Sequence, residues 1–254
     1  MADLTDVIPV AMPIIRDVAA VYLKHTSPWF IGLIVHGSAV KGGFIPGCSD
    51  IDFQLFLDDA AFTWCGELAL DVGFSIRRDL AKIDPTPFAY IQCYARKVEQ
   101  SDNIIGPIPG AYRLIAGTLP VAEATTEQLR ESAKQALAGL NAPTFVIGEL
   151  LGHGGGRLAR NLRLLCTKVW PVLYQVLTLQ QEDAIGIWNL RKDQAIDRLP
   201  QKTALRETIQ RFYRAVQTYY SAEESLEDAF LVIESGAAFL GAAKSWWNAV
   251  NNRA

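Results

Sequence analysis

The sequence predicts an α+β protein, with a mixed sheet in its N-terminal half and helices alone in its C-terminal half. Before residue 121, short apolar runs alternate with turns rich in glycine and proline, which is typical of strands and helices joined by loops. After Pro120, apolar residues recur at helical spacing to the end of the chain. We therefore expect two domains, residues 1–120 and residues 121–254.

The N-terminal domain should begin with a helix over residues 4–24, which Pro13 should kink because proline has no backbone N–H. A second helix should start at a cap formed by Asp58 or Asp59 and run to about Ile83. Four strands are expected, near residues 30–36, 50–57, 88–96 and 112–115.

The C-terminal domain should contain helices throughout. Residues 126–130 read Thr-Glu-Gln-Leu-Arg, a polar start followed by apolar residues at helical spacing. Neither an internal repeat nor a low-complexity segment interrupts the pattern. The expected helices lie near residues 126–140, 144–151, 156–180, 182–196, 201–220 and 222–250.

The composition disfavours several classes of protein. Half of the 254 residues are apolar and a fifth are charged, and the net charge of −3 gives no basic field to recruit nucleic acid. The four cysteines form no CxxC pair and there are three histidines, which disfavours a zinc site and fits reduced thiols in the cytoplasm. No apolar run is long enough to span a membrane. These features predict a cytoplasmic globular protein.

The most informative segment joins a small-residue turn to a pair of carboxylates. Gly37 and Ser38 follow the first predicted strand, and after eleven further residues Asp50 and Asp52 flank Ile51. Because side chains alternate along a strand, both carboxylates should point to one face while Ile51 points into the core. Neighbouring anions repel, and divalent cations commonly neutralise them. The pattern predicts phosphoryl or nucleotidyl transfer; the alternative is a solvated pair of aspartates without a ligand.

This turn and carboxylate pair resemble the nucleotidyltransferase superfamily typified by DNA polymerase β, with residues 49–53 (SDIDF) similar to its acidic element. In the helical half, residues 159–166 (ARNLRLLC) and 187–200 (IWNLRKDQAIDRLP) resemble the C-terminal domain of streptomycin and spectinomycin adenylyltransferases. The resemblance implies a polymerase β-like mixed sheet with helices, followed by an all-helical bundle domain.

The resemblance also implies an activity and the residues that perform it. Gly37 and Ser38 would bind the terminal phosphates of a nucleoside triphosphate, and Asp50 and Asp52 would ligate two Mg²⁺ ions. Lys192 would provide a further contact to the phosphates. The reaction would transfer a nucleoside monophosphate, AMP from ATP, to a hydroxyl of a small acceptor. An aminoglycoside-like compound is one option, which the net negative charge favours, and a protein side chain is another.

The chain departs from the family pattern on the third predicted strand. Members carry a third carboxylate there, whereas residues 88–95 contain none, and Gln92 or Tyr90 occupies the place. Neither side chain is an anionic base near neutral pH. Glu149, on a later predicted helix, could take the role of the catalytic base, and Asp84 is nearer in sequence but lies in a proline turn, so the base is left open. The gap leaves open a different class of function, a protein that binds nucleotide or a partner without turnover.

Two further features have structural interpretations. His36 precedes the turn on a buried strand and is expected to be a packed, hydrogen-bonded side chain rather than a ligand. Trp246 and Trp247 are expected to lie in the core or in a homodimer contact.

Overall fold

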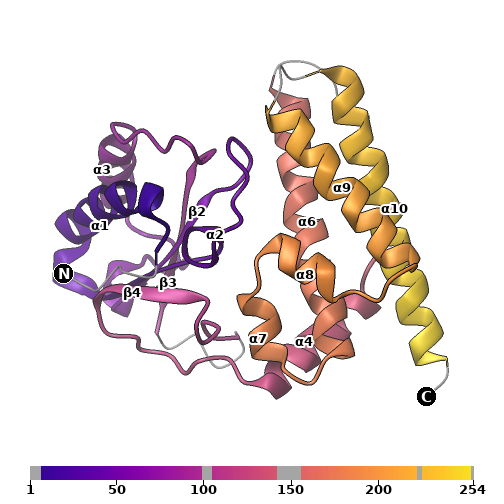
Figure 1. Cartoon of the computed structure of the whole chain (residues 1–254). Helices are drawn as coiled ribbons and strands as arrows, with labels where there is room; N and C mark the ends of the chain where they lie inside the picture. Colours follow the sequence, from indigo (N-terminus) through magenta and orange to yellow (C-terminus); the bar gives the residue numbers. More distant parts are fainter. Residues whose placement is uncertain (1–6, 99–104, 142–155, 222–224, 253–254) are drawn as a thin grey trace. The chain divides into compact units, whose positions relative to one another are not determined.

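Residues 7–98, 105–141, 156–221 and 225–252 are described in the computed structural model of the chain (Figure 1). The chain divides into two compact units, one on each side of the peptide bond between Ala124 and Thr125. The first unit contains a four-stranded sheet with helices, and the described elements of the second are all helices. The predicted α+β class is confirmed.

The sheet is mixed and has the strand order β3-β2-β1-β4. Strand β1 is antiparallel to both β2 and β4, whereas β3 runs parallel to β2. The third strand begins three residues later than predicted, because the Phe88 N–H donates to the Pro85 carbonyl in a turn (2.9 Å). The strands are β1 (Phe30–His36), β2 (Ile51–Leu57), β3 (Ile91–Lys97) and β4 (Tyr112–Gly117).

One face of the sheet packs against helices α1 (Met12–Thr26) and α3 (Leu70–Leu80), which lie side by side in Figure 1. The Tyr22 ring of α1 meets the Phe53 ring of β2 edge-on, with 5.9 Å between the ring centroids. The alternating pattern of the strands explains which face is covered, since every second side chain is buried against the helices. These buried strand residues include Leu33, Val35, Ile51, Phe53, Leu55, Leu57 and Ile115.

The start of the first helix differs from the prediction. Pro13 lies in the first turn of α1, where its missing N–H has no helical acceptor to lose, so it begins the helix instead of kinking it. A short 3-10 helix, η1 (Pro9–Ala11), precedes α1.

The prediction of one helix from Asp58 or Asp59 to Ile83 is wrong for the first half of that segment. Asp58 does cap a helix, because its Oδ1 accepts from the Ala60 N–H (2.9 Å), but that helix is the short η3 (Asp59–Ala61). A β-bridge between Phe62 and Leu68 follows, closed through Gly66 at a φ of +83°. This positive φ favours glycine and prevents a continuous helix through the segment.

The helical unit begins at a capping box, in which Thr125 accepts from the Gln128 N–H and Gln128 accepts from the Thr125 N–H. The helix predicted over residues 182–196 is two short helices, because Leu190 and Arg191 have extended backbone conformations. The helix predicted over residues 144–151 lies outside the described residues. The helices are α4 (Thr126–Ala138), α6 (Arg157–Gln180), α7 (Ala184–Asn189), α8 (Lys192–Arg198), α9 (Ala204–Ser221) and α10 (Leu226–Asn251).

Packing within this unit follows the apolar stripes of its helices. The buried residues of α9 recur every three or four positions and form one stripe along the helix. Helix α10 packs against both α9 and α6. Among the described helices, none combines the length and the apolar character that a membrane span requires.

Candidate functional site

The turn after β1 places Gly37 against Asp52 of the neighbouring strand. Gly37 has a φ of +76°, a conformation that favours glycine, and its carbonyl accepts from the N–H groups of Val40 and Lys41 in the short helix α2 (Ser38–Lys41). A Cβ atom at residue 37 would lie 2.8 Å from Asp52 Oδ2. The absence of a side chain at Gly37 therefore keeps open the space beside the Asp52 carboxylate.

The two predicted carboxylates project from the face that α1 and α3 do not cover. Ile51 and Phe53 are fully buried, whereas Asp50 and Asp52 are half-buried, so the alternation predicted from the sequence is present. The preceding loop is anchored through Ser49, whose Oγ accepts from the Ile45 N–H (2.9 Å). The backbone at the start of β2 is thus fixed where the carboxylates begin.

Strand register brings four polar side chains into one row across the same face. Asp52 pairs with His36 on β1 and with Gln92 on β3, and His36 pairs with Tyr112 on β4. Directly paired residues on neighbouring strands share a face of the sheet. The Tyr112 hydroxyl donates to Glu123 (2.8 Å), and burial together with this carboxylate raises the pKa of Tyr112 to about 12.

Gln92 occupies the position beside Asp52 where the resemblance implies a third carboxylate. Its Oε1 accepts from the Tyr90 hydroxyl (3.1 Å), and its Nε2 donates to the Tyr94 hydroxyl (2.6 Å). These bonds hold a neutral amide in place, and an amide does not accept a proton near neutral pH. Within the described ranges, no group of three or more His, Cys, Asp or Glu side chains is arranged to hold a metal ion.

His36 is packed as expected, but its hydrogen bonding differs from the expectation. Burial, with smaller contributions from the positive charges of Arg96 and Lys41, lowers the pKa of His36 to about 4. Its buried Nε2 has no hydrogen-bond partner among the described residues. The imidazole is therefore neutral near pH 7 and lies in the same row as Asp52.

The remaining predicted site residues lie elsewhere in the chain. Lys192 is the first residue of α8 in the helical unit, and its Nζ lies 5.7 Å from the centroid of the Trp170 ring, a cation–π contact. Glu149, the candidate base, lies outside the described residues.

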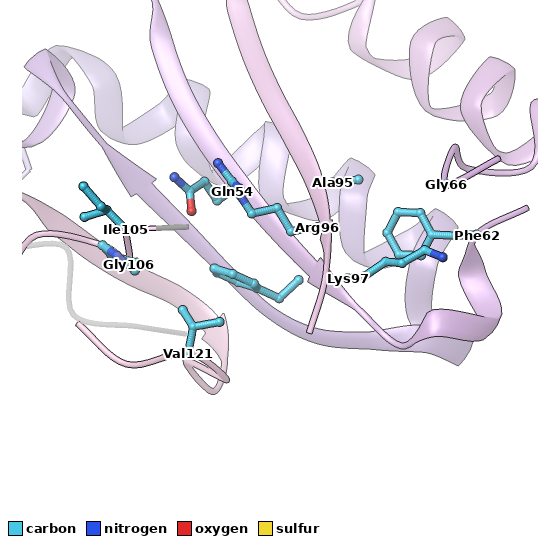
Figure 2. Close-up of a pocket in the computed structure, with 11 residues that line it drawn as sticks. Gln54, Phe62, Gly66, Ala95, Arg96, Lys97, Ile105, Gly106 and Val121 are labelled. Atoms are coloured by element: carbon cyan, nitrogen blue, oxygen red, sulfur yellow. The ribbon is translucent and has the colours of Figure 1, made fainter. Parts of the chain in front are cut away.

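The structure also reveals a cavity that the sequence did not indicate, with a volume of about 140 Å³ (Figure 2). It is lined by Gln54 of β2, which follows Asp52 by two residues, and by the cations Arg96 and Lys97 at the end of β3. The one feature of the sequence that relates to this cavity is the pair of adjacent basic residues, Arg96 and Lys97, at the end of a predicted strand. Side chains from the segments around Phe62, Gly106 and Val121 complete the cavity.

The carboxylate pair fits a magnesium site. Mg²⁺ in proteins binds one or two carboxylates and takes its other ligands from waters and substrate phosphates, so a third protein carboxylate is not required to hold it. The space that Gly37 leaves beside Asp52 gives room for such ligands.

These features define a fold: a unit with a mixed four-stranded sheet and helices, followed by a unit whose described elements are all helices. Among solved structures, the chain is similar to spectinomycin adenyltransferase AAD(9) from Enterococcus faecialis, whose crystal structure contains ATP and spectinomycin. The two are 16% identical, the match covers 91% of this chain and 99% of that chain, and the TM-score is 0.53. Neither a protein-family model nor a curated protein matches the sequence. At this identity, the likeness shows the fold.

Proposed function

We propose that the chain is a Mg²⁺-dependent nucleotidyltransferase that transfers AMP from ATP to a hydroxyl of a small acceptor. The observation that carries the proposal is the contact between Gly37 and Asp52. This contact places the glycine of the turn, which has no side chain, next to a carboxylate pair on one face of the sheet. The fold shared with an adenyltransferase supports it.

Each proposed site residue has a role in the reaction. Asp50 and Asp52 would hold two Mg²⁺ ions, which would neutralise charge on the phosphates. The backbone N–H groups of Gly37 and Ser38 and the Ser38 hydroxyl bind the terminal phosphates. Lys192 is a further ligand of the phosphates. The acceptor oxygen bonds to the α-phosphorus, the bond from that phosphorus to the bridging oxygen breaks, and pyrophosphate leaves.

The proton of the acceptor hydroxyl requires a base. Gln92 lies beside Asp52 but orients groups only through hydrogen bonds, so it does not take the proton. Glu149 is the proposed base, and Glu149→Gln tests it. If turnover is unchanged in that variant, another group accepts the proton.

The second candidate is a protein that binds nucleotide without turnover, and the neutral Gln92 beside Asp52 favours it. Calorimetry with ATP and Mg²⁺ and an assay of pyrophosphate release separate the two functions. Binding without release for any acceptor would favour the second candidate, whereas release with an acceptor would establish the transferase.

The site itself is tested by Asp50→Asn, with Asp17→Asn on the exposed side of α1 as a control of equal charge change. We expect the Asp50 variant to lose Mg²⁺-dependent ATP binding by at least tenfold while its thermal unfolding is unchanged or shifts upward, because one of two repelling charges is removed. The Asp17 variant should bind as the wild type does. Unchanged ATP binding in the Asp50 variant would exclude this carboxylate as a metal ligand.

A further inference from the structure

We propose that the cavity beside the carboxylate pair binds an acidic group of the acceptor, so that the acceptor is an anionic hydroxyl compound that carries a carboxylate or a phosphate. This inference rests on the proposed function and assigns the substrate class of the same site.

Two residues of the cavity wall, Gln54 of β2 and Arg96 of β3, lie on the same face of the sheet as the carboxylate pair. Gln54 lines it and follows Asp52 by two residues on β2, so the two side chains share a face and their Cα atoms are about 7 Å apart at the usual rise of a strand. An acceptor of a few carbon atoms spans that distance. A group bound in the cavity therefore leaves a hydroxyl of the same molecule near Asp52.

Arg96 supplies the first anion-binding group. Its side chain extends along the sheet toward Gln54 (Figure 2), and its charge contributes to the lowered pKa of His36 in the polar row. The buried Nε of Arg96 has no hydrogen-bond partner among the described residues. A guanidinium binds a carboxylate or phosphate through two parallel hydrogen bonds, and such a ligand would satisfy the unpaired Nε.

Lys97 supplies a second positive charge at another part of the wall, since it follows Arg96 on β3 and therefore points to the opposite face of the sheet. Its Nζ lies 5.3 Å from the centroid of the Phe62 ring, which also lines the cavity (Figure 2). The described lining contains these two cations and no carboxylate. The charge of the described lining is thus opposite in sign to the net charge of −3 of the whole chain. Close contacts respond to the local charge, because bulk solvent and salt screen distant charges.

The cavity wall is built to keep its shape. Gly106 packs so closely on the Ala122 carbonyl that a Cβ at residue 106 would overlap that oxygen. The Ala124 N–H donates to the Pro107 carbonyl (3.0 Å), which fixes the two segments to each other. The volume of about 140 Å³ is close to that of protein cavities that hold one benzene molecule, so the cavity admits a single carboxylate or phosphate group.

These features favour an anionic acceptor over a cationic one. An amine beside Gln54 would meet the Arg96 guanidinium and no carboxylate among the described lining residues, and like charges in a partly buried site repel strongly. The aminoglycoside-like acceptor that the sequence suggested is therefore disfavoured at this cavity.

The first experiment measures anion binding without nucleotide or Mg²⁺, so that its result does not depend on the proposed reaction. Malonate and inorganic phosphate are titrated at constant ionic strength while the backbone amide resonances of Arg96 and Gly106 are followed by NMR. We expect saturable shifts at both residues, with binding weakened at least fivefold in Arg96→Gln and less in Lys97→Gln, because Lys97 points to the opposite face of the sheet. The control Arg78→Gln removes one exposed positive charge from α3 and should bind as the wild type does.

The second experiment measures pyrophosphate release with four acceptors that differ in charge: glucose 6-phosphate, gluconate, glucose and glucosamine. We expect release with an acidic acceptor, and we expect Arg96→Gln to raise the KM for that acceptor at least tenfold while the KM for ATP is unchanged. A preference for glucosamine or an increase in the KM for ATP alone would overturn the proposal.

The two experiments separate the failure of each proposal. Anion shifts confined to Gly37 and Ser38, or equal malonate binding in Arg96→Gln and the wild type, would overturn the cavity assignment while leaving ATP binding intact. Malonate binding in the cavity combined with no loss of ATP binding in Asp50→Asn would instead contradict the proposed function.

Discussion

Gln92 lies directly beside Asp52, because β3 and β2 pair in parallel with these two residues in register. The carboxylate pair and a neutral amide are therefore neighbours on one sheet face. Gln92 itself supplies no proton acceptor at this position.

We predict that Gln92→Glu raises the rate of pyrophosphate release in the presence of an acceptor. The new carboxylate would be an anionic base beside Asp52, and general bases contribute on the order of a hundredfold or more to rates. The variant should also unfold at a lower temperature without Mg²⁺ and recover with it, because three neighbouring carboxylates repel until a cation binds. Gln92→Met is the control, since it removes the hydrogen bonds to Tyr90 and Tyr94 without adding a charge. A Mg²⁺-independent melting temperature in Gln92→Glu would place residue 92 away from the metal.

Gly37→Ala should disrupt the turn and the carboxylate together. The added Cβ would press on Asp52 Oδ2, and alanine at a φ of +76° costs about 1–2 kcal/mol. We expect the free energy of unfolding to fall by about that amount or more, and Mg²⁺-dependent ATP binding to weaken at least tenfold. Gly73→Ala in α3 is the matched control, because a Cβ there meets no atom within 4 Å, and it should raise stability by about 0.5–1 kcal/mol. Wild-type ATP affinity in Gly37→Ala would contradict the role of this turn.

Arg206→Met should destabilise the helical unit. Arg206 is 9% exposed, and its guanidinium donates to the carbonyls of Ile196, Asp197 and Leu199 at the end of α8. Methionine would leave these acceptors unsatisfied, at a cost of about 2–4 kcal/mol in chemical denaturation. Arg211→Met, on the exposed side of the same helix, should change stability by less than about 0.5 kcal/mol. Equal effects of the two substitutions would show that the carbonyl contacts add no stability.

The stability that Asp79 contributes should depend on pH. Hydrogen bonds from Lys24, Lys82 and His25 hold the pKa of the Asp79 carboxyl well below its usual range. The folded state therefore binds fewer protons than the unfolded state as pH falls below about 4, and the contribution is lost there. We expect Asp79→Asn to be less stable than the wild type at pH 5 and above, and the difference to shrink as pH decreases from 4. A difference that is constant down to pH 2 would contradict the charged interaction.

Local patterns were sufficient to predict most of the first unit. The strands containing His36 and Asp52 and the outward direction of both aspartates follow from alternation, which depends on a few neighbouring residues. The prediction of a helix through Gly66 was wrong, because a β-bridge between Phe62 and Leu68 forms there. The spacing of apolar residues in the sequence does not indicate such a bridge.

The cavity was not predictable, because its wall combines segments that are far apart in the sequence. In the sequence, Arg96 and Lys97 are ordinary basic residues at a strand end. They line a cavity because the fold brings Gly106 and Val121 to the same wall. The sequence left two candidates, Gln92 and Tyr90, for the neutral residue beside Asp52. The register between β2 and β3 shows that it is Gln92, and the pattern of a single strand does not encode this register.

The parallel pairing of β2 with β3 determines where a change in chain length would alter the site. Residues 58–90 connect the two strands, and a change of length in an exposed turn of this connection leaves the register of β2 and β3 unchanged. A shift of one residue would instead put Ile91 or Cys93 beside Asp52 and turn Gln92 and Arg96 to the opposite face. An insertion in such a turn would leave Gln92 and Arg96 in place, whereas an insertion at the start of β3 would turn both side chains away from the site.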